Sequence, residues 1–182
     1  MTMNLIPDNE LEELLKPHIR DIPDFPKPGI LFKDITTLLR EPEMLRISLE
    51  QMALRFQNMD IQHVVGIESR GFILGTPLAY LLKAGFVPVR KAGKLPGATY
   101  RKEYALEYGS DVLEIHQDAI QPGEKVLLCD DLLATGGTAR ATLEMLEELG
   151  ANVVGSVFAI ELLFLNGREK LSNCKTVSLI KY

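Results

Sequence analysis

The sequence has little of what several common protein classes require. Its 182 residues include two cysteines and three histidines. Cys129 and Cys174 are too few for a disulfide framework, so we expect both to be reduced and to serve in packing. The histidines, His18, His63 and His116, are scattered and lack the spacing of a zinc site. The sequence therefore predicts neither a disulfide scaffold nor a zinc centre.

Features of membrane proteins and of nucleic-acid-binding proteins are also missing. No uninterrupted apolar stretch approaches the roughly 18 residues that span a bilayer. The net charge is −5, which argues against general nucleic-acid binding. The first 16 residues carry no basic apolar leader and indicate a short acidic helix, so we expect a cytoplasmic location. With 46% hydrophobic residues, the chain suits a single domain over residues 1–182.

What is present is a regular alternation of strand-like and helix-like segments, typical of βαβ units. The expected strands cover residues 63–67, 86–89, 126–129 and 152–160, and the expected helices cover residues 41–57, 72–83 and 138–149. Pro42 opens the first of these helices and Gly150 ends the last. Pro77 lies inside the second and is expected to delay its start or bend it. The pattern predicts an α/β fold with a mostly parallel central sheet flanked by helices.

Residues 126–139, VLLCDDLLATGGTA, join a buried strand, two acids, a glycine loop and a helix start. Asp130 and Asp131 are expected at the carboxyl end of the strand, where ligands of open α/β sheets bind. Adjacent carboxylates there can hold two vicinal hydroxyls, directly or through water or Mg²⁺. The glycines and helix start that follow form a phosphate cradle. No G-x-x-x-x-G-K-[ST] occurs and no G-x-G-x-x-G follows a strand, which disfavours ordinary ATPases and dinucleotide dehydrogenases.

Residues 91–111 interrupt the regular pattern with a long stretch rich in Gly, Tyr and charge. Long loops of this kind are usually functional, and we interpret this one as a lid that closes over the site and excludes water. The other interpretation is a surface hairpin without a gating role. Five basic residues lie in or beside the stretch: Arg90, Lys91, Lys94, Arg101 and Lys102. This concentration of charge in an acidic protein suits a diphosphate group and favours the lid.

The strand, DD and TGGT in this order resemble the phosphoribosyl pyrophosphate (PRPP) signature of type I phosphoribosyltransferases. Five further stretches, FPKPGILFKDIT (25–36), IESRGF (67–72), RKAGKLPG (90–97), LEYG (106–109) and NGREKL (166–171), are similar to the adenine phosphoribosyltransferase family over nearly the whole chain. The resemblance implies transfer of a phosphoribosyl group from PRPP to adenine, giving AMP and diphosphate. It also implies a type I fold, a small N-terminal hood at residues 1–35, a flexible lid at 91–111 and a homodimer.

Roles for individual residues follow from the same resemblance. Asp130 and Asp131 would hold the ribose hydroxyls, and the phosphate loop would bind the 5′-phosphate of PRPP or AMP. That loop consists of Ala134, Thr135, Gly136, Gly137 and Thr138. The diphosphate would meet Glu68, Ser69 and Arg70, with Arg70 also near the purine and in a catalytic role. Family members often have Asp at position 68. The lysines Lys91 and Lys94 would add charge, although a solvated surface role for either lysine remains open, as does a surface salt bridge for Arg70.

The adenine pocket implied by the resemblance uses main-chain groups of Leu31, a stacked Phe32 and Leu162 on the other face of the base. Lys33 stands where an arginine is common, which leaves a donor contact available but changes its geometry. From the pattern alone, Phe32 and Leu162 are equally explained as core residues. The stretch 159–163, AIELL, lacks the lysine expected of enzymes that act on 6-oxopurines.

The resemblance places a catalytic acid at Glu107, accompanied by Tyr108, to assist proton movement on the purine as N9 attacks the anomeric carbon. Mg²⁺ is the expected cofactor, carried mostly by the diphosphate and ribose oxygens rather than by protein ligands. Two rival functions remain: a transferase for hypoxanthine, guanine or xanthine, and a PRPP-sensing regulator without catalysis. The regulator would need a nucleic-acid-binding surface, which this acidic chain does not suggest.

Overall fold

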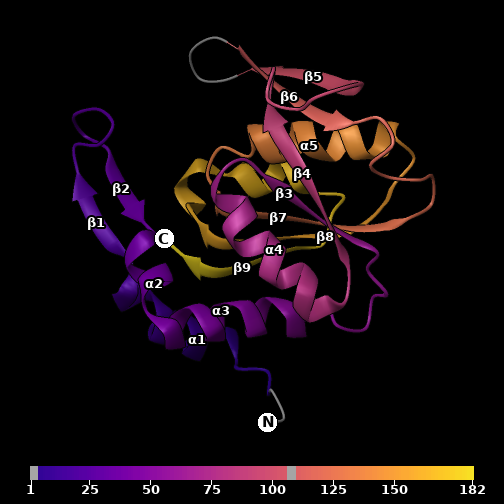
Figure 1. The fold of residues 1–182 in the computed structure, drawn as a ribbon. Helices are drawn as coiled ribbons and strands as arrows, with labels where there is room; N and C mark the ends of the chain where they lie inside the picture. Colours follow the sequence, from indigo (N-terminus) through magenta and orange to yellow (C-terminus); the bar gives the residue numbers. More distant parts are fainter. Residues whose placement is uncertain (1–3, 106–109) are drawn as a thin grey trace.

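A seven-stranded sheet runs through the protein, which the computed structural model describes over residues 4–105 and 110–182 (Figure 1). Its strands are β3 (His63–Ile67), β4 (Gly85–Lys91), β5 (Thr99–Ala105), β6 (Ser110–His116), β7 (Lys125–Leu133), β8 (Asn152–Glu161) and β9 (Thr176–Lys181). The spatial order is β5-β6-β4-β3-β7-β8-β9. The five strands from β4 to β9 are parallel to their neighbours, whereas β6 and β5 add an antiparallel edge. The predicted α/β fold with a mostly parallel sheet is confirmed.

Helices cover both faces of this sheet. They are α1 (Asp8–Leu15), α2 (Thr36–Arg40), α3 (Pro42–Leu54), α4 (Arg70–Leu82) and α5 (Gly137–Glu148), with short 3-10 turns η1 (Lys16–His18), η2 (Leu163–Leu165) and η3 (Gly167–Leu171). Alternate residues of each strand face opposite sides. Val64 and Leu127 therefore pack with α1, α3 and α4, while Val65 and Leu128 pack with α5. Among the described helices, none is long and apolar enough to cross a membrane.

The predicted helices are present, with shifted ends. Pro42 occupies the first turn of α3 as expected. In α4 the prediction was wrong at the start: the helix begins at Arg70, two residues early, and continues through Pro77. Burial explains this, because Gly71, Leu74 and Leu78 all face the core on one side of the helix. Gly150, with a φ of 79°, follows the end of α5.

The central strand is longer than predicted, and this changes the position of the acids. We expected a strand over 126–129 with Asp130 and Asp131 beyond it, but β7 continues to Leu133. The reason is its neighbour on one side: β8 pairs with β7 as far as Leu133, whereas the pairing with β3 on the other side ends at Cys129. The two acids therefore lie in the strand, just past the carboxyl end of β3.

Residues 91–111, predicted as a long loop, are largely a hairpin within the described part of the chain. β5 pairs with β6 from Thr99 opposite His116 to Ala105 opposite Ser110. Alternation explains the extended form, since Tyr100 and Tyr104 are packed against the core while Arg101 and Glu103 are exposed. The hairpin interpretation is thus correct for the secondary structure. Closure over a site stays a prediction.

A separate two-stranded ribbon of β1 (Arg20–Pro23) and β2 (Leu31–Asp34) projects beside the main sheet (Figure 1). Its base is fixed by Asp34, which is buried and accepts hydrogen bonds from the Arg20 guanidinium at 2.5 and 3.1 Å and from the Thr36 N–H at 2.9 Å. These bonds lower the pKa of Asp34 although burial opposes them. The ribbon lies in the predicted N-terminal hood, whose part in base binding stays a prediction.

Candidate active site

A pocket of about 340 Å³ opens past the carboxyl ends of β3 and β7. It brings together seven of the residues that the sequence predicted for the site: Glu68, Ser69, Arg70, Lys91, Asp130, Asp131 and Thr138. Next to it, a smaller pocket of about 80 Å³ is lined by residues 132–139 and Asp130. The three segments that carry these side chains are far apart in sequence, and the parallel order β4-β3-β7 places them at one edge of the sheet.

The two adjacent acids occupy unlike environments. Asp131 is buried and pairs with Arg70, whose Nε lies 2.5 Å from Oδ2. The Asp131 N–H donates to Oδ1 of Asp130 at 2.9 Å. Burial, together with the charge of Asp131, raises the pKa of Asp130 well above its ordinary value. The Asp130 carboxylate therefore lies where hydrogen-bond donors or a cation would stabilise its charge, as two ribose hydroxyls or Mg²⁺ would do.

The predicted phosphate loop connects β7 with α5 through a left-handed glycine. Gly136 has a φ of 75°, a conformation that glycine adopts without steric cost. α5 begins at the next residue, and no side chain caps its N-terminus within the described structure. The first backbone N–H groups of α5 are thus available to an anion and add the positive end of the helix dipole. Tyr104 of the β5–β6 hairpin lies near the start of α5, since its hydroxyl is 3.4 Å from the Thr138 hydroxyl.

Glu68 forms ion pairs with two basic side chains from the segment expected to bind diphosphate. Its carboxylate accepts hydrogen bonds from Nζ of Lys94 at 2.5 Å, from Arg90 at 3.3 Å and from the Lys91 N–H at 3.1 Å. Burial raises the pKa of Glu68, but the bonds from Lys94 and Arg90 outweigh it and leave that pKa at about 2. The peptide bond that joins Glu68 to Ser69 is cis.

Lys91 has a different acidic partner. Its Nζ lies 3.0 Å from Oδ2 of Asp111 on β6. This hydrogen bond and the attraction between the two charges raise the pKa of Lys91 and lower that of Asp111. The basic residues are therefore paired with the protein's own carboxylates, and a diphosphate would have to exchange with them.

The residues predicted to contact the base lie on β2 and after β8. Phe32 is half-buried, packs edge-on against Phe25 at 5.1 Å between ring centroids, and has the Arg70 guanidinium 5.7 Å from its ring. Leu31 is 49% exposed. Leu162 is half-buried and its N–H donates to the Leu133 carbonyl at 2.9 Å, which places it beside the end of β7. Arg70 thus links the predicted base segment to Asp131.

Lys33 is turned elsewhere. Its ammonium group lies 2.6 Å from Oδ1 of Asp21 and 3.9 Å from the centroid of the Tyr182 ring. The side chain is 10% exposed. Lys33 therefore supports the base of the β1–β2 ribbon in this structure, and its predicted contact with adenine would require another conformation.

Two polar residues of the pocket were missed by sequence reasoning. Tyr104 and Asp111 line the pocket and lie opposite each other in the β5–β6 register. The alternation of polar and aromatic residues through 99–105 was the signal for this hairpin. Glu107 and Tyr108 lie outside the described residues. Among the residues that are described, no group of three or more His, Cys, Asp or Glu side chains could hold a metal ion.

Known proteins are similar to this chain over most of its length. Residues 34–178 match the phosphoribosyl transferase domain family. An adenine phosphoribosyltransferase of Acaryochloris marina is 60% identical over 168 residues, covering 92% of this chain and 99% of the relative. The chain belongs to the adenine phosphoribosyltransferase family. The predicted resemblance to that family is thereby confirmed.

Solved structures of the adenine phosphoribosyltransferase family have the same fold. The enzyme from Rhodothermus marinus is 52% identical with a TM-score of 0.91, covering 96% of this chain and 99% of its own. The Saccharomyces cerevisiae enzyme, crystallised with adenine and an imino-altritol bisphosphate, is 43% identical with a TM-score of 0.90 over 94% of this chain and 99% of its own. The predicted type I phosphoribosyltransferase fold is confirmed.

Proposed function

We propose that this enzyme, an adenine phosphoribosyltransferase, works by holding PRPP across the pocket at the carboxyl ends of β3 and β7 and transferring its phosphoribosyl group to N9 of adenine. The products are AMP and diphosphate. The observation that carries this proposal is the meeting of paired acids, a glycine phosphate loop and a basic segment around one pocket. Each matches a different part of PRPP: the ribose diol, the 5′-phosphate and the diphosphate.

The ribose and the 5′-phosphate are assigned to β7 and the loop that follows it. Asp130 and Asp131 accept hydrogen bonds from the two ribose hydroxyls, and the 134–138 loop binds the phosphate through backbone N–H groups. Placement at the start of α5 favours a doubly charged phosphate there. Binding of the diol also relieves the unfavourable pairing of two neighbouring carboxylates.

Three basic residues near the end of β4 are suited to one step of the reaction, the departure of diphosphate. Lys91, Lys94 and Arg90 lie beside Glu68 and Asp111, so their charges are already concentrated at the pocket wall. As the bond from the anomeric carbon to diphosphate breaks, negative charge accumulates on the leaving group. Preorganised cations stabilise that charge more than they stabilise intact PRPP, which lowers the barrier.

Mg²⁺ fits the same site. The Asp130 carboxylate lies where positive charge is lacking, and carboxylate, hydroxyl and phosphate oxygens are the ligands that Mg²⁺ prefers. Asp130 and Asp131 would meet the ion through water or through the ribose hydroxyls, with most ligands coming from PRPP. When bound, the ion neutralises the departing diphosphate.

Adenine is assigned to the space between the β1–β2 ribbon and the end of β8. The main-chain groups of Leu31 read the amino group and a ring nitrogen, Phe32 stacks on the ring and Leu162 covers its other face. Closure of the 91–111 segment as a lid would keep water away from the oxocarbenium-like anomeric carbon. Without that protection, water would hydrolyse PRPP instead of adenine being ribosylated.

Glu107 is assigned the proton transfer that accompanies attack by N9. We expect Glu107→Gln to bind PRPP with unchanged affinity and to lose about 10²–10⁴-fold in turnover, the usual contribution of acid–base assistance. Calorimetry with PRPP and a spectrophotometric assay of AMP formation measure the two quantities. Full turnover in this variant would remove Glu107 from the mechanism.

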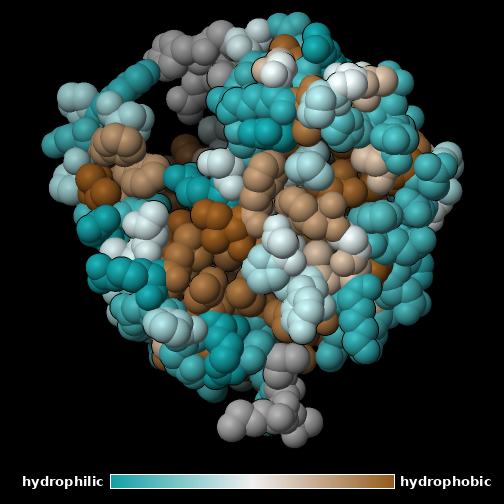
Figure 2. Space-filling view, in the orientation of Figure 1, coloured by the Kyte–Doolittle hydropathy of each residue, from teal (hydrophilic) through white to brown (hydrophobic). Residues whose placement is uncertain are grey.

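The active form is proposed to be a homodimer in the cytoplasm. α4 presents Ile73 and Tyr80, which are 50% and 83% exposed and lie two turns apart on one side of the helix. In the same orientation as Figure 1, Figure 2 shows hydrophobic residues gathered on this face within a hydrophilic border. Such a patch suits an interface between copies. Two free cysteines, Cys129 and Cys174, agree with a reducing compartment.

A further inference from the structure

The stretch between β8 and β9 carries NGREKL, a motif to which the proposed mechanism gives no role. It consists of η2 and η3 joined at Asn166, whose φ of 52° lies in the left-handed region. Asparagine tolerates that conformation better than most residues. The Asn166 N–H donates to the Leu163 carbonyl at 3.0 Å, and η3 then packs beside α5. The chain thus turns back toward the start of α5, where the phosphate loop lies.

Gly167 touches the phosphate loop through its backbone. A Cβ atom built on Gly167 would lie 2.1 Å from the Ala134 carbonyl oxygen and 2.9 Å from the Gly136 nitrogen. Conversely, a Cβ on Gly136 would lie 2.4 Å from the Gly167 carbonyl oxygen. Side chains cannot approach so closely, so the two backbones meet only because both residues are glycine. The backbone of the 134–138 loop is therefore in direct contact with the backbone of Gly167.

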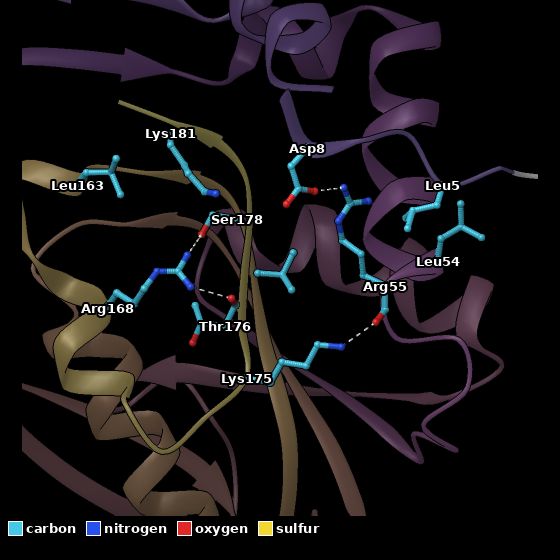
Figure 3. A pocket seen from close by; sticks show the side chains of 11 residues that line it. Leu5, Asp8, Leu54, Arg55, Leu163, Arg168, Lys175, Thr176, Ser178 and Lys181 are labelled. Carbon is cyan, nitrogen blue, oxygen red and sulfur yellow. Dashed lines mark hydrogen bonds and ion pairs between the residues drawn. The ribbon is translucent and has the colours of Figure 1, made fainter. Parts of the chain in front are cut away.

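Arg168 fixes this support in place. Figure 3 shows its guanidinium directed to β9, where it donates to the Thr176 carbonyl at 2.7 Å and to the Ser178 hydroxyl at 3.3 Å. It also pairs with Glu161, the buried last residue of β8, through Nε at 2.8 Å and through Nη2. One planar side chain, next to Gly167 in the sequence, thereby links the last residue of β8 to Thr176 and Ser178 in the first half of β9. A lysine could not make this set of directed bonds.

We propose that Arg168 is a positioning residue for the 5′-phosphate: by binding Glu161 and β9 it holds Gly167 against the 134–138 loop. The same contact with Glu161 fixes the chain just before Leu162. Arg168 therefore positions both the loop proposed to bind the phosphate and the residue proposed to cover the base. This inference rests on the proposed function. Its physical basis is that backbone N–H groups must be placed within a fraction of an ångström to bind a phosphate well.

The test compares PRPP binding and turnover in three variants. We expect Arg168→Gln to raise the Kd for PRPP, with Mg²⁺ present, by about tenfold or more, because a small displacement of a binding loop has effects of this size. Arg168→Lys should lie between this variant and the wild type. Gly167→Ala should weaken PRPP binding at least as much. In each variant, kcat at saturating PRPP should fall less than kcat/KM, because Arg168 does not touch the reacting atoms.

Arg55→Gln is the matched control. Arg55 lines the same cleft of about 540 Å³ as Arg168, and it binds Asp8 at 2.6 Å (Figure 3) and the Gln51 carbonyl at 2.9 Å. Neither of these interactions involves the phosphate loop. Arg55→Gln should therefore lower the melting temperature and leave the Kd for PRPP unchanged.

Three results would overturn the inference. These are wild-type PRPP affinity in Arg168→Gln, the same loss of affinity in Arg55→Gln, and an Arg168→Lys variant that is as stable as the wild type and binds PRPP equally well. Arg168→Lys decides the question if Gly167→Ala does not fold. A wild-type protein that forms no AMP would defeat the proposed function instead, so the two failures are distinguishable.

Discussion

At the scale of the residue, the adjacent carboxylates of Asp130 and Asp131 impose an electrostatic cost on the folded protein. Arg70 compensates Asp131, but Asp130 is left with a raised pKa. A native carboxyl whose pKa is raised binds its proton more tightly than it does in the unfolded chain. Stability therefore falls as the pH rises from the ordinary Asp pKa through the native one, and stays low above it. The proposed function uses these charges, and the fold tolerates their cost.

We predict that Asp130→Asn raises the melting temperature at pH 7 while weakening PRPP binding. The amide removes the repelled charge, and each kcal/mol gained corresponds to about 2–4 °C for a chain of this size. The stability difference should shrink as the pH falls toward the ordinary Asp pKa, because less of the carboxyl is then ionised in the unfolded wild-type chain. Thermal scans from pH 4 to 8 and PRPP calorimetry measure both effects.

Asp118→Asn serves as the control for this substitution, because Asp118 is exposed and lies outside the pocket. It should leave both the melting temperature and the affinity for PRPP unchanged. If Asp130→Asn were less stable than the wild type at pH 7, the electrostatic cost assigned to Asp130 would be wrong.

At the scale of the element, the turn that follows β4 and carries Lys94 is positioned by a buried acid of β6. Glu114 is fully buried, accepts the Gly93 N–H at 2.9 Å and pairs with Nε of Arg101 at 2.8 Å. The backbone bond from Gly93 lowers the pKa of Glu114 although burial opposes it. Glu114 thus fixes the turn that follows Lys91 and carries Lys94, the two lysines proposed to bind diphosphate.

Replacing this acid should loosen the turn. We predict that Glu114→Gln raises the KM for PRPP by about tenfold, since misplaced cations stabilise the diphosphate poorly. It should also speed hydrogen exchange at the Gly93 amide. Glu103→Gln, whose exposed carboxylate bonds only to Ser110 in the described structure, should change neither quantity. Unaltered exchange at Gly93 in Glu114→Gln would contradict the role given to Glu114.

The elements also show where sequence reasoning succeeds and where it stops. Local patterns predicted α3, α4 and α5 and the parallel strands β3, β4, β7 and β8, because one-sided burial dictates their periodicity. The short helix α2 and the edge strand β9 were not predicted. The full length of β7 was missed, because pairing with β8 extends it past the apolar run into Asp130 and Asp131. The contact of Gly167 with the phosphate loop joins residues about thirty positions apart and leaves no periodic signal. Long-range contacts of this kind become visible only in the folded chain.

Site residues followed the same division. Asp130, Asp131, Arg70 and Glu68 were predicted by motif, and the fold brings them to one pocket. Tyr104 and Asp111 were missed, because their place depends on the register of a hairpin that the sequence left ambiguous. Lys33 was predicted from the family resemblance, and alternation along β2 turns its side chain toward Asp21 and Tyr182.

At the scale of the whole molecule, the exposed apolar side of α4 is the surface from which the proposed dimer follows. We predict that Tyr80→Glu converts a dimer to a monomer in sedimentation velocity, because burying an unpaired charge in an apolar interface is unfavourable. Phe164→Glu is the control, since Phe164 is also exposed, at 70%, but lies on η2. The proposed interface would be wrong if the wild-type protein sedimented as a monomer or if the Tyr80→Glu variant remained dimeric.

The central claim is that this pocket transfers a phosphoribosyl group to adenine in preference to other purines. The most direct measurement mixes the protein with PRPP, Mg²⁺ and, in separate reactions, adenine, hypoxanthine, guanine and xanthine, and quantifies nucleoside monophosphate and diphosphate. We predict AMP and diphosphate in equal amounts from adenine and no nucleotide from the other three bases. Product from a 6-oxopurine alone would contradict the base site, and PRPP binding without any product would contradict catalysis and favour a PRPP-sensing regulator.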